Sequence, residues 1–143
     1  MVRLKVTSIA ISALACAALL GCGPRGEKLI PVVGQVTIDG APLKSGSVTY
    51  HADAAKGNST PHIPVGVVDA DGRYKLASAT KEGAPPGWYR VTVTAQEPID
   101  PKNPYAPPKH LIDPKYGDAT TSGLEVEVAP NKSPSAYDLK LAK

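Results

Sequence analysis

Beyond Leu29, apolar and polar residues alternate with a period of two along most of the chain. The clearest stretch is WYRVTVTA at 88–95, in which Tyr89, Val91 and Val93 fall on one side and polar residues fall between them. Successive side chains of a β-strand point to opposite faces, so this alternation is typical of strands with one buried face. The same pattern predicts strands over 32–38, 47–51, 64–68, 73–77, 88–95, 124–128 and 137–141.

Turn signals separate these predicted strands and point to an all-β fold. Asp39-Gly40 and Asp71-Gly72 are typical hairpin-turn pairs, and the chain holds 15 prolines and 13 glycines. After the N-terminal segment, no stretch of the sequence carries the apolar stripe of an amphipathic helix. Half-buried strands cover their apolar faces by packing two sheets together, so we expect a seven-stranded β-sandwich.

The first residues have the pattern of an export signal. Arg3 and Lys5 precede an apolar stretch over residues 6–20. Its length of about 15 residues suits a signal peptide and is short of the roughly 20 residues that a membrane-spanning helix needs. A signal peptide is therefore predicted over residues 1–21, with an uncleaved membrane anchor as the alternative.

Cys22 ends this segment in the sequence LLGC at residues 19–22. The motif resembles the lipobox of bacterial lipoproteins, although Leu20 is bulkier than the usual residue at its place. The resemblance implies cleavage before Cys22, a diacylglyceryl group on its sulfur and an acylated amine; two or more acyl chains hold a protein stably at a membrane. A disulfide to Cys16 would instead tie Cys22 to the removed segment. We expect residues 22–29 to form a lipidated tether and residues 30–143 to form the domain.

Four stretches of the domain resemble the carboxypeptidase regulatory-like domain: VVGQVTIDGAPLKSGSVTYH, PVGVVDADGRYKLAS, GAPPGWYRVTVT and KYGDATTSGLEVEV. The likeness covers most of residues 30–142 and rests on structural motifs, such as Asp-Gly turns and a Gly-x-Tyr-x-Val entry into a strand. It implies a Greek-key, transthyretin-like sandwich of the prealbumin type, which occurs in small bacterial surface lipoproteins and is not itself catalytic.

Charge and histidine placement argue against two classes of function. The net charge of +3 falls close to neutral once Arg3 and Lys5 are set aside, so nucleic-acid binding is not expected. His51, His62 and His110 are far apart in the sequence, whereas a zinc site needs three or four ligands on rigid elements. We therefore expect neither a metal nor another cofactor.

Two further patterns suggest chemistry that the rest of the sequence does not support. Residues 69–72, DADG, lack the ligand spacing of an EF-hand and are typical of a hairpin turn. A transthyretin-like fold raises the possibility of a hydroxyisourate hydrolase, but the chain ends in LKLAK instead of that family's Tyr-Arg-Gly-Ser. We therefore do not expect an enzyme, although a pocket joining two histidines with Arg90 or Arg73 would support the hydrolase.

The longest irregular segment runs from Gln96 to Ser122 between two predicted strands. Loops of this length are usually functional or disordered. Its prolines recur at every third position, and polyproline II has three residues per turn, so we expect a single ridge of proline rings. The segment either presents groups to a partner or packs across its own domain. The candidate partner-binding residues are Pro98, Pro101, Pro104, Tyr105, Pro107, His110 and Tyr116.

Together, these features predict a non-catalytic, lipid-anchored protein of the bacterial cell envelope with a structural or protein-binding role. Gly23 follows the cysteine, and the lack of aspartate at this position favours the outer membrane. The alternative is a module that binds carbohydrate or another envelope polymer, in which Trp88 and the loop tyrosines would form a flat platform.

Replacing Cys22 by serine tests the predicted lipid anchor. Serine lacks the thiol that forms the thioether, so the C22S protein should lose incorporation of labelled fatty acid and sedimentation with membranes. The matched variant C16S, altered inside the predicted signal peptide, should keep both. Unchanged labelling of the C22S protein would refute the lipobox assignment.

Overall fold

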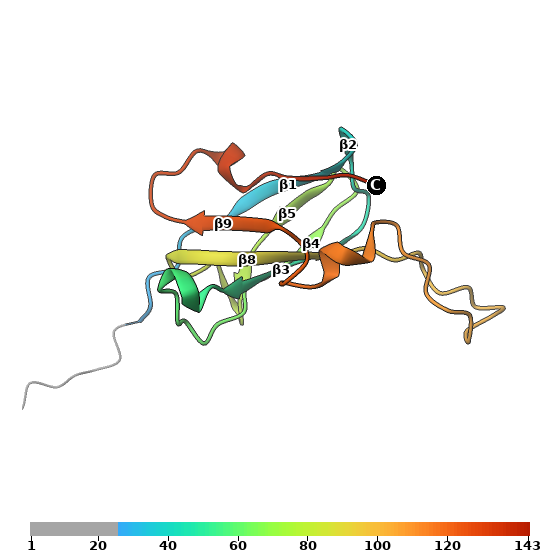
Figure 1. Ribbon diagram of the computed structural model, residues 1–143, viewed down its shortest axis with the longest axis horizontal. Helices are drawn as coiled ribbons and strands as arrows, with labels where there is room; N and C mark the ends of the chain where they lie inside the picture. Colours follow the sequence, from blue (N-terminus) through green and yellow to red (C-terminus); the bar gives the residue numbers. More distant parts are fainter. Residues whose placement is uncertain (1–25) are drawn as a thin grey trace, which may run out of the picture.

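The computed structural model describes residues 26–143, which form an all-β fold built from a mostly antiparallel sheet that curls around one core (Figure 1). Three short 3-10 segments are the only helical elements in this part of the chain. The signal peptide, Cys22 and the first half of the expected tether lie outside the described residues. No helix within residues 26–143 is long and apolar enough to cross a membrane.

Seven strands form at the places that the alternation predicts, with small differences at their ends. The predicted strand over 73–77 is divided at Leu76, and the last strand begins two residues later than expected, because Pro134–Tyr137 forms a 3-10 turn named η3. The seven strands are β1 (Val33–Ile38), β3 (Gly46–Ala52), β4 (Val65–Val68), β5 (Arg73–Lys75), β8 (Gly87–Thr94), β9 (Leu124–Val128) and β10 (Leu139–Leu141).

Three further strands of two residues each were not predicted as separate strands. They are β2 (Ala41–Pro42), β6 (Ala77–Ser78) and β7 (Lys81–Glu82). Strand β2 pairs with β1, and the hairpin of β6 and β7 extends the sheet from β4. Such short strands contain too few residues to show an alternating pattern, so the sequence offers no periodic signal for them.

The strands follow the order β10-β1-β5-β4-β3-β8-β9, and β1 with β10 is the parallel pair of this path. The longest ladder joins β3 to β8, from Ser47 opposite Thr94 to Ala52 opposite Tyr89. Strands β9 and β10 are consecutive in the chain but lie at the two ends of this order. The connection at 129–138 carries the chain from one edge of the sheet to the other, which the curl makes possible.

The core forms on the inner face, where the alternation predicts it. Val48 and Tyr50 of β3 are fully buried, as are Tyr89, Val91 and Val93 of β8. Full burial of a side chain of this size contributes about 1.5–3 kcal/mol, so this central ladder accounts for a large part of the stability. The other buried apolar side chains include Val32, Val36, Leu43, Val68, Tyr74, Leu76, Val126, Val128, Tyr137, Leu139 and Leu141.

A chain of hydroxyl groups crosses this core and fixes the C-terminal segment. The Tyr74 hydroxyl donates to the Tyr137 carbonyl oxygen at 2.6 Å, and the Tyr50 hydroxyl lies 3.0 Å from that of Tyr74. Since Tyr74 donates its proton to Tyr137, Tyr50 is the donor between the two phenols. Burial raises the pKa of both Tyr50 and Tyr74, so their neutral forms favour the fold, and this contribution is lost as pH rises above about 10.

Gly34 lets the same C-terminal segment approach β1 closely. A Cβ atom at this position would lie 2.2 Å from the Tyr137 carbonyl oxygen and 2.9 Å from the Tyr74 ring. The next residue, Gln35, donates its backbone N–H to the Asp138 carboxylate at 2.9 Å. These contacts align the chain so that β10 pairs in parallel with β1, from Val36 opposite Leu139 onward.

Replacing Tyr74 by phenylalanine tests this hydroxyl chain. The variant leaves the Tyr137 carbonyl oxygen without its donor and the Tyr50 hydroxyl without its acceptor, so the free energy of unfolding should fall by about 1–3 kcal/mol. Urea denaturation measures the change. Tyr105→Phe, which removes a hydroxyl from a side chain that is 95% exposed, is the control and should leave stability unchanged. Equal stability of the two variants would contradict the role of Tyr74.

Candidate functional site

After β8 the chain leaves the sheet and returns to it as a hairpin, which extends away from the body of the molecule (orange in Figure 1). Leu111 donates its backbone N–H to Ala95 at 2.9 Å, and Glu97 donates to Lys109 at 2.9 Å. Gln96 and His110 form an isolated β-bridge between these bonds. We refer to residues 96–110 as the proline-rich hairpin, and these contacts fix its base to the end of β8.

Two successive turns reverse the chain at the far end of the hairpin. The Asp100 carboxylate accepts the backbone N–H of Lys102 at 2.9 Å, and Asn103 donates to the Asp100 carbonyl oxygen at 2.9 Å. Ala106 then donates its N–H to the Asn103 carbonyl oxygen at 3.1 Å. Asp and Asn favour such turns because their side chains bond to backbone groups one or two residues further on.

The expected polyproline II ridge is therefore wrong. Pro98 lies on the outgoing arm, Pro101 and Pro104 lie in the region of the two turns, and Pro107 lies on the returning arm. Polyproline II has no internal hydrogen bonds, so the turn bonds at Asp100 and Asn103 interrupt it and reverse the chain.

The two arms stay apart beyond the base and enclose a hollow of about 460 Å³. Proline has no backbone N–H to donate to a ladder, so Pro98 on one arm and Pro107 and Pro108 on the other prevent the arms from pairing further. Both apolar and polar residues line the hollow. Ile99 and these prolines provide apolar surface, and Asp100 is one of the polar residues. The hairpin is thus an open loop with a fixed base.

Two of the three most exposed large apolar side chains within residues 26–143 belong to the hairpin, and the third is Val67. Tyr105 is 95% exposed and Ile99 is 74% exposed. A single exposed apolar residue is common on protein surfaces, but here both belong to one projecting element of 15 residues, counted from Gln96 to His110. Aromatic side chains of this kind are the residues that most often dominate protein–protein contacts.

The second half of the irregular segment packs onto the domain. Ile112 and Tyr116 are buried, and the Tyr116 hydroxyl accepts the backbone N–H of Ala142 at 3.0 Å. Tyr116 lies in the 3-10 segment η2 (Pro114–Gly117). The two interpretations of the segment thus apply to different parts of it: residues 96–110 project, whereas residues 111–122 cover the end of the core. Tyr116, which we expected on a partner-binding surface, is not accessible to a partner.

Two aspartates fix the covering segment. The Asp113 carboxylate accepts the backbone N–H of Lys115, and this bond holds the pKa of Asp113 below its usual value. The Asp118 carboxylate accepts the hydroxyl and the backbone N–H of Thr120, which lowers the pKa of Asp118 in the same way. Both contributions to stability are present above the ordinary aspartate pKa and are lost as pH falls through the lowered value.

The three histidines lie in separate places. His51 on β3 bonds to the Thr92 hydroxyl at 3.1 Å, His62 forms an ion pair with Glu27 at 3.1 Å, and His110 stands at the base of the hairpin. Among residues 26–143, no histidine lines the hollow of the hairpin, His62 lines a second hollow beside Glu27, and neither hollow is lined by an arginine. In the same part of the chain, no group of three or more His, Cys, Asp or Glu side chains is placed to hold a metal.

The aromatic side chains do not form one platform. Trp88 lies half-buried at the beginning of β8, where the Lys56 ammonium group stands 4.2 Å from the centre of its ring. Lys56 also forms an ion pair with Glu125, which holds it over the indole. Tyr105 belongs to the hairpin beyond the other end of β8, so the length of that strand separates the two rings.

The Asp69–Gly72 stretch is a hairpin turn between β4 and β5, as expected. One Asp69 carboxylate oxygen accepts the backbone N–H groups of Asp71 and Arg73, both at 2.9 Å. Gly72 has a φ of +77°, a conformation that glycine adopts without strain.

Comparisons of the chain with models of protein families, with curated proteins and with solved structures each gave no match.

Proposed function

We propose that this chain is a lipid-anchored protein of the bacterial cell envelope, whose domain presents the proline-rich hairpin to a partner protein without catalysing a reaction. The observation that carries the proposal is the exposure of Tyr105 and Ile99 on a projecting element whose base is fixed. These two side chains bury little of their apolar surface in the domain. A partner with an apolar pocket would cover them and gain about 25 cal/mol for each Å² removed from water.

The hairpin is suited to binding because much of its order exists before a partner arrives. Binding by a flexible loop loses affinity through the entropy of ordering it. Here the bridge between Gln96 and His110 and the turn bonds at Asp100 and Asn103 already restrict the backbone, and the prolines fix five further φ angles. A protein surface is favoured over a polysaccharide, because within residues 26–143 no second aromatic ring pairs with Tyr105 to form a sugar-binding platform.

For the fold we propose the seven-stranded, Greek-key, transthyretin-like sandwich that the resemblance implies. The seven longer strands at the expected places support this assignment, as does the curl that brings apolar side chains of β1, β3, β5 and β8 into one core. In this arrangement the three short strands are additions at turns and edges.

The lipid anchor and the hairpin would act at opposite ends of the domain. The described chain enters at residues 26–32, and the hairpin extends from the other end of the molecule (blue and orange in Figure 1). Glu27 is held to the domain by His62 and by the Thr60 hydroxyl. Cys22 and Glu27 are five positions apart, so the chain between them spans at most about 18 Å. A short anchor at one end would direct the hairpin away from the membrane.

A photo-crosslinking amino acid at position 105 tests the proposed contact. In intact cells, full-length protein carrying the crosslinker in place of Tyr105 should form a discrete adduct with one envelope protein. The control carries the same crosslinker in place of Lys132, an exposed residue in the connection between β9 and β10. Adducts that are equal at both positions, or absent at position 105, would contradict the proposal.

A further inference from the structure

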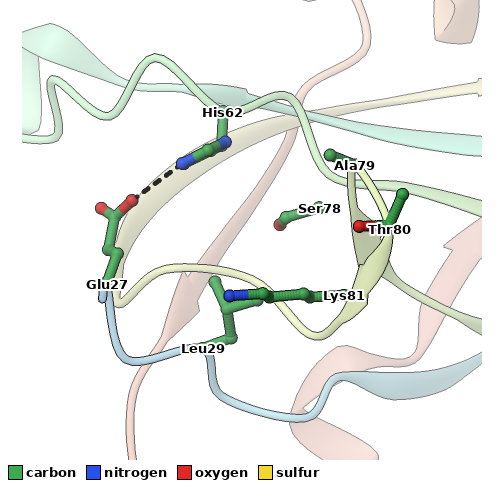
Figure 2. Close-up of a pocket in the computed structure, with 7 residues that line it drawn as sticks. All are labelled: Glu27, Leu29, His62, Ser78, Ala79, Thr80 and Lys81. Carbon is green, nitrogen blue, oxygen red and sulfur yellow. Dashed lines mark ion pairs between the residues drawn. The ribbon is translucent and has the colours of Figure 1, made fainter.

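A second hollow, of about 180 Å³, lies where the entering chain meets the sheet (Figure 2). Three segments that are distant in sequence form it: residues 27–29, the loop at His62, and the turn between β6 and β7. Ile30 and Ala84 hold the first and last of these together by exchanging two backbone hydrogen bonds, at 2.8 and 2.9 Å. The hollow is therefore part of the folded domain.

One positive charge faces this hollow without a partner in the part of the chain that the structure describes. Lys81 of β7 extends across the hollow beside Leu29, with its ammonium group directed towards the side of Glu27 (Figure 2). No ion pair among residues 26–143 includes Lys81. The Thr80 hydroxyl points into the same space (Figure 2).

The one carboxylate at the hollow is already engaged. Glu27 lies 3.1 Å from Nε2 of His62 and accepts the Thr60 hydroxyl at 3.3 Å. These contacts occupy the Glu27 carboxylate, so the Lys81 ammonium group is left available to bind a small anion.

The turn that carries Thr80 and Lys81 has an unusual backbone. Ala79 has a φ of +55°, in the left-handed region that residues with a Cβ rarely adopt. The Ser78 hydroxyl donates to the Gly83 carbonyl oxygen at 2.7 Å, and Ser78 pairs with Lys81 in the short β6–β7 ladder. These contacts keep the strained turn in place and direct both side chains to the hollow.

We propose that this hollow binds a phosphate group, either free or as an ester. The Lys81 ammonium and the Thr80 hydroxyl would donate hydrogen bonds to it from different sides of the hollow. Donors spread around a centre suit a tetrahedral anion better than a flat carboxylate, and lysine binds phosphate as a point charge. Binding involves no covalent step.

Phosphate at this place has two sources, a soluble phosphate compound and a lipid headgroup. The hollow lies at the end where the chain enters the domain, so a lipid anchor at Cys22 would bring it close to the membrane surface. The headgroup as a source thus rests on the proposed function, whereas the phosphate chemistry of the hollow does not.

Titration of the full-length protein, held in detergent micelles, with inorganic phosphate tests the site directly. Lys81→Gln should weaken binding about tenfold or more, because the neutral amide cannot replace the charge-assisted hydrogen bonds that the ammonium group donates. Lys140→Gln is the matched control: it removes the same charge from an exposed strand residue outside the hollow and should leave binding unchanged.

Titration of the same two variants with a water-soluble, short-chain phosphatidic acid separates the sources. This probe is used in place of vesicles because the acyl chains at Cys22 would hold both variants on a membrane whatever the hollow binds. A loss of short-chain phosphatidic acid binding specific to Lys81→Gln assigns the phosphate to a lipid headgroup, and a loss confined to inorganic phosphate assigns it to a soluble compound. No loss specific to Lys81 with either probe overturns the proposal. Fatty-acid labelling at Cys22 is measured separately, so failure of the anchor does not imitate failure of the hollow.

Discussion

The hydrogen bond from the Tyr74 hydroxyl of β5 to the Tyr137 carbonyl oxygen fixes the segment that carries the chain from one edge of the sheet to the other. It holds η3 against the sheet at the place where the next residues pair with β1 as strand β10. A hydroxyl group buried without a partner costs about 1–3 kcal/mol, so the bond fixes one position for η3 instead of several similar ones. Gly34 is required for the same reason, since any side chain at its position would push the Tyr137 carbonyl away.

With its edges fixed, the curled sheet provides two separate places for function. At one end, residues 27–30 pair with the region of Ala84 and form the small hollow with Lys81 and His62. At the other end, the β3–β8 ladder stops at Thr94 and the proline-rich hairpin begins. The rigid ladder between them keeps the hairpin far from the point where the chain enters. A tethered domain with this arrangement would present its hairpin outward.

Much of the fold follows from local pattern, whereas both candidate sites depend on contacts that the sequence does not reveal. Alternation in 88–95 predicts β8 correctly, because one face of the strand is buried along its full length. The same reasoning fails in the hairpin, where proline spacing suggests a ridge but the turns at Asp100 and Asn103 reverse the chain. The small hollow joins residues 27, 62 and 81, which the pairing of Ile30 with Ala84 and the contact of Glu27 with His62 bring together. One signal of the exposed surface of the hairpin is present in the sequence, because Ile99 is an apolar residue within a proline-rich, polar segment.

The central claim is that the proline-rich hairpin serves a partner and not the stability of its own domain. The most direct test is the free energy of unfolding in urea of full-length protein in which residues 98–108 are replaced by a Gly/Ser linker of equal length. Since the base at Glu97 and Lys109 stays and the loop length is unchanged, the free energy should remain within about 1 kcal/mol of the original value. A decrease of several kcal/mol, or loss of a single cooperative transition, would show that the hairpin is a structural part of the domain and would contradict the claim.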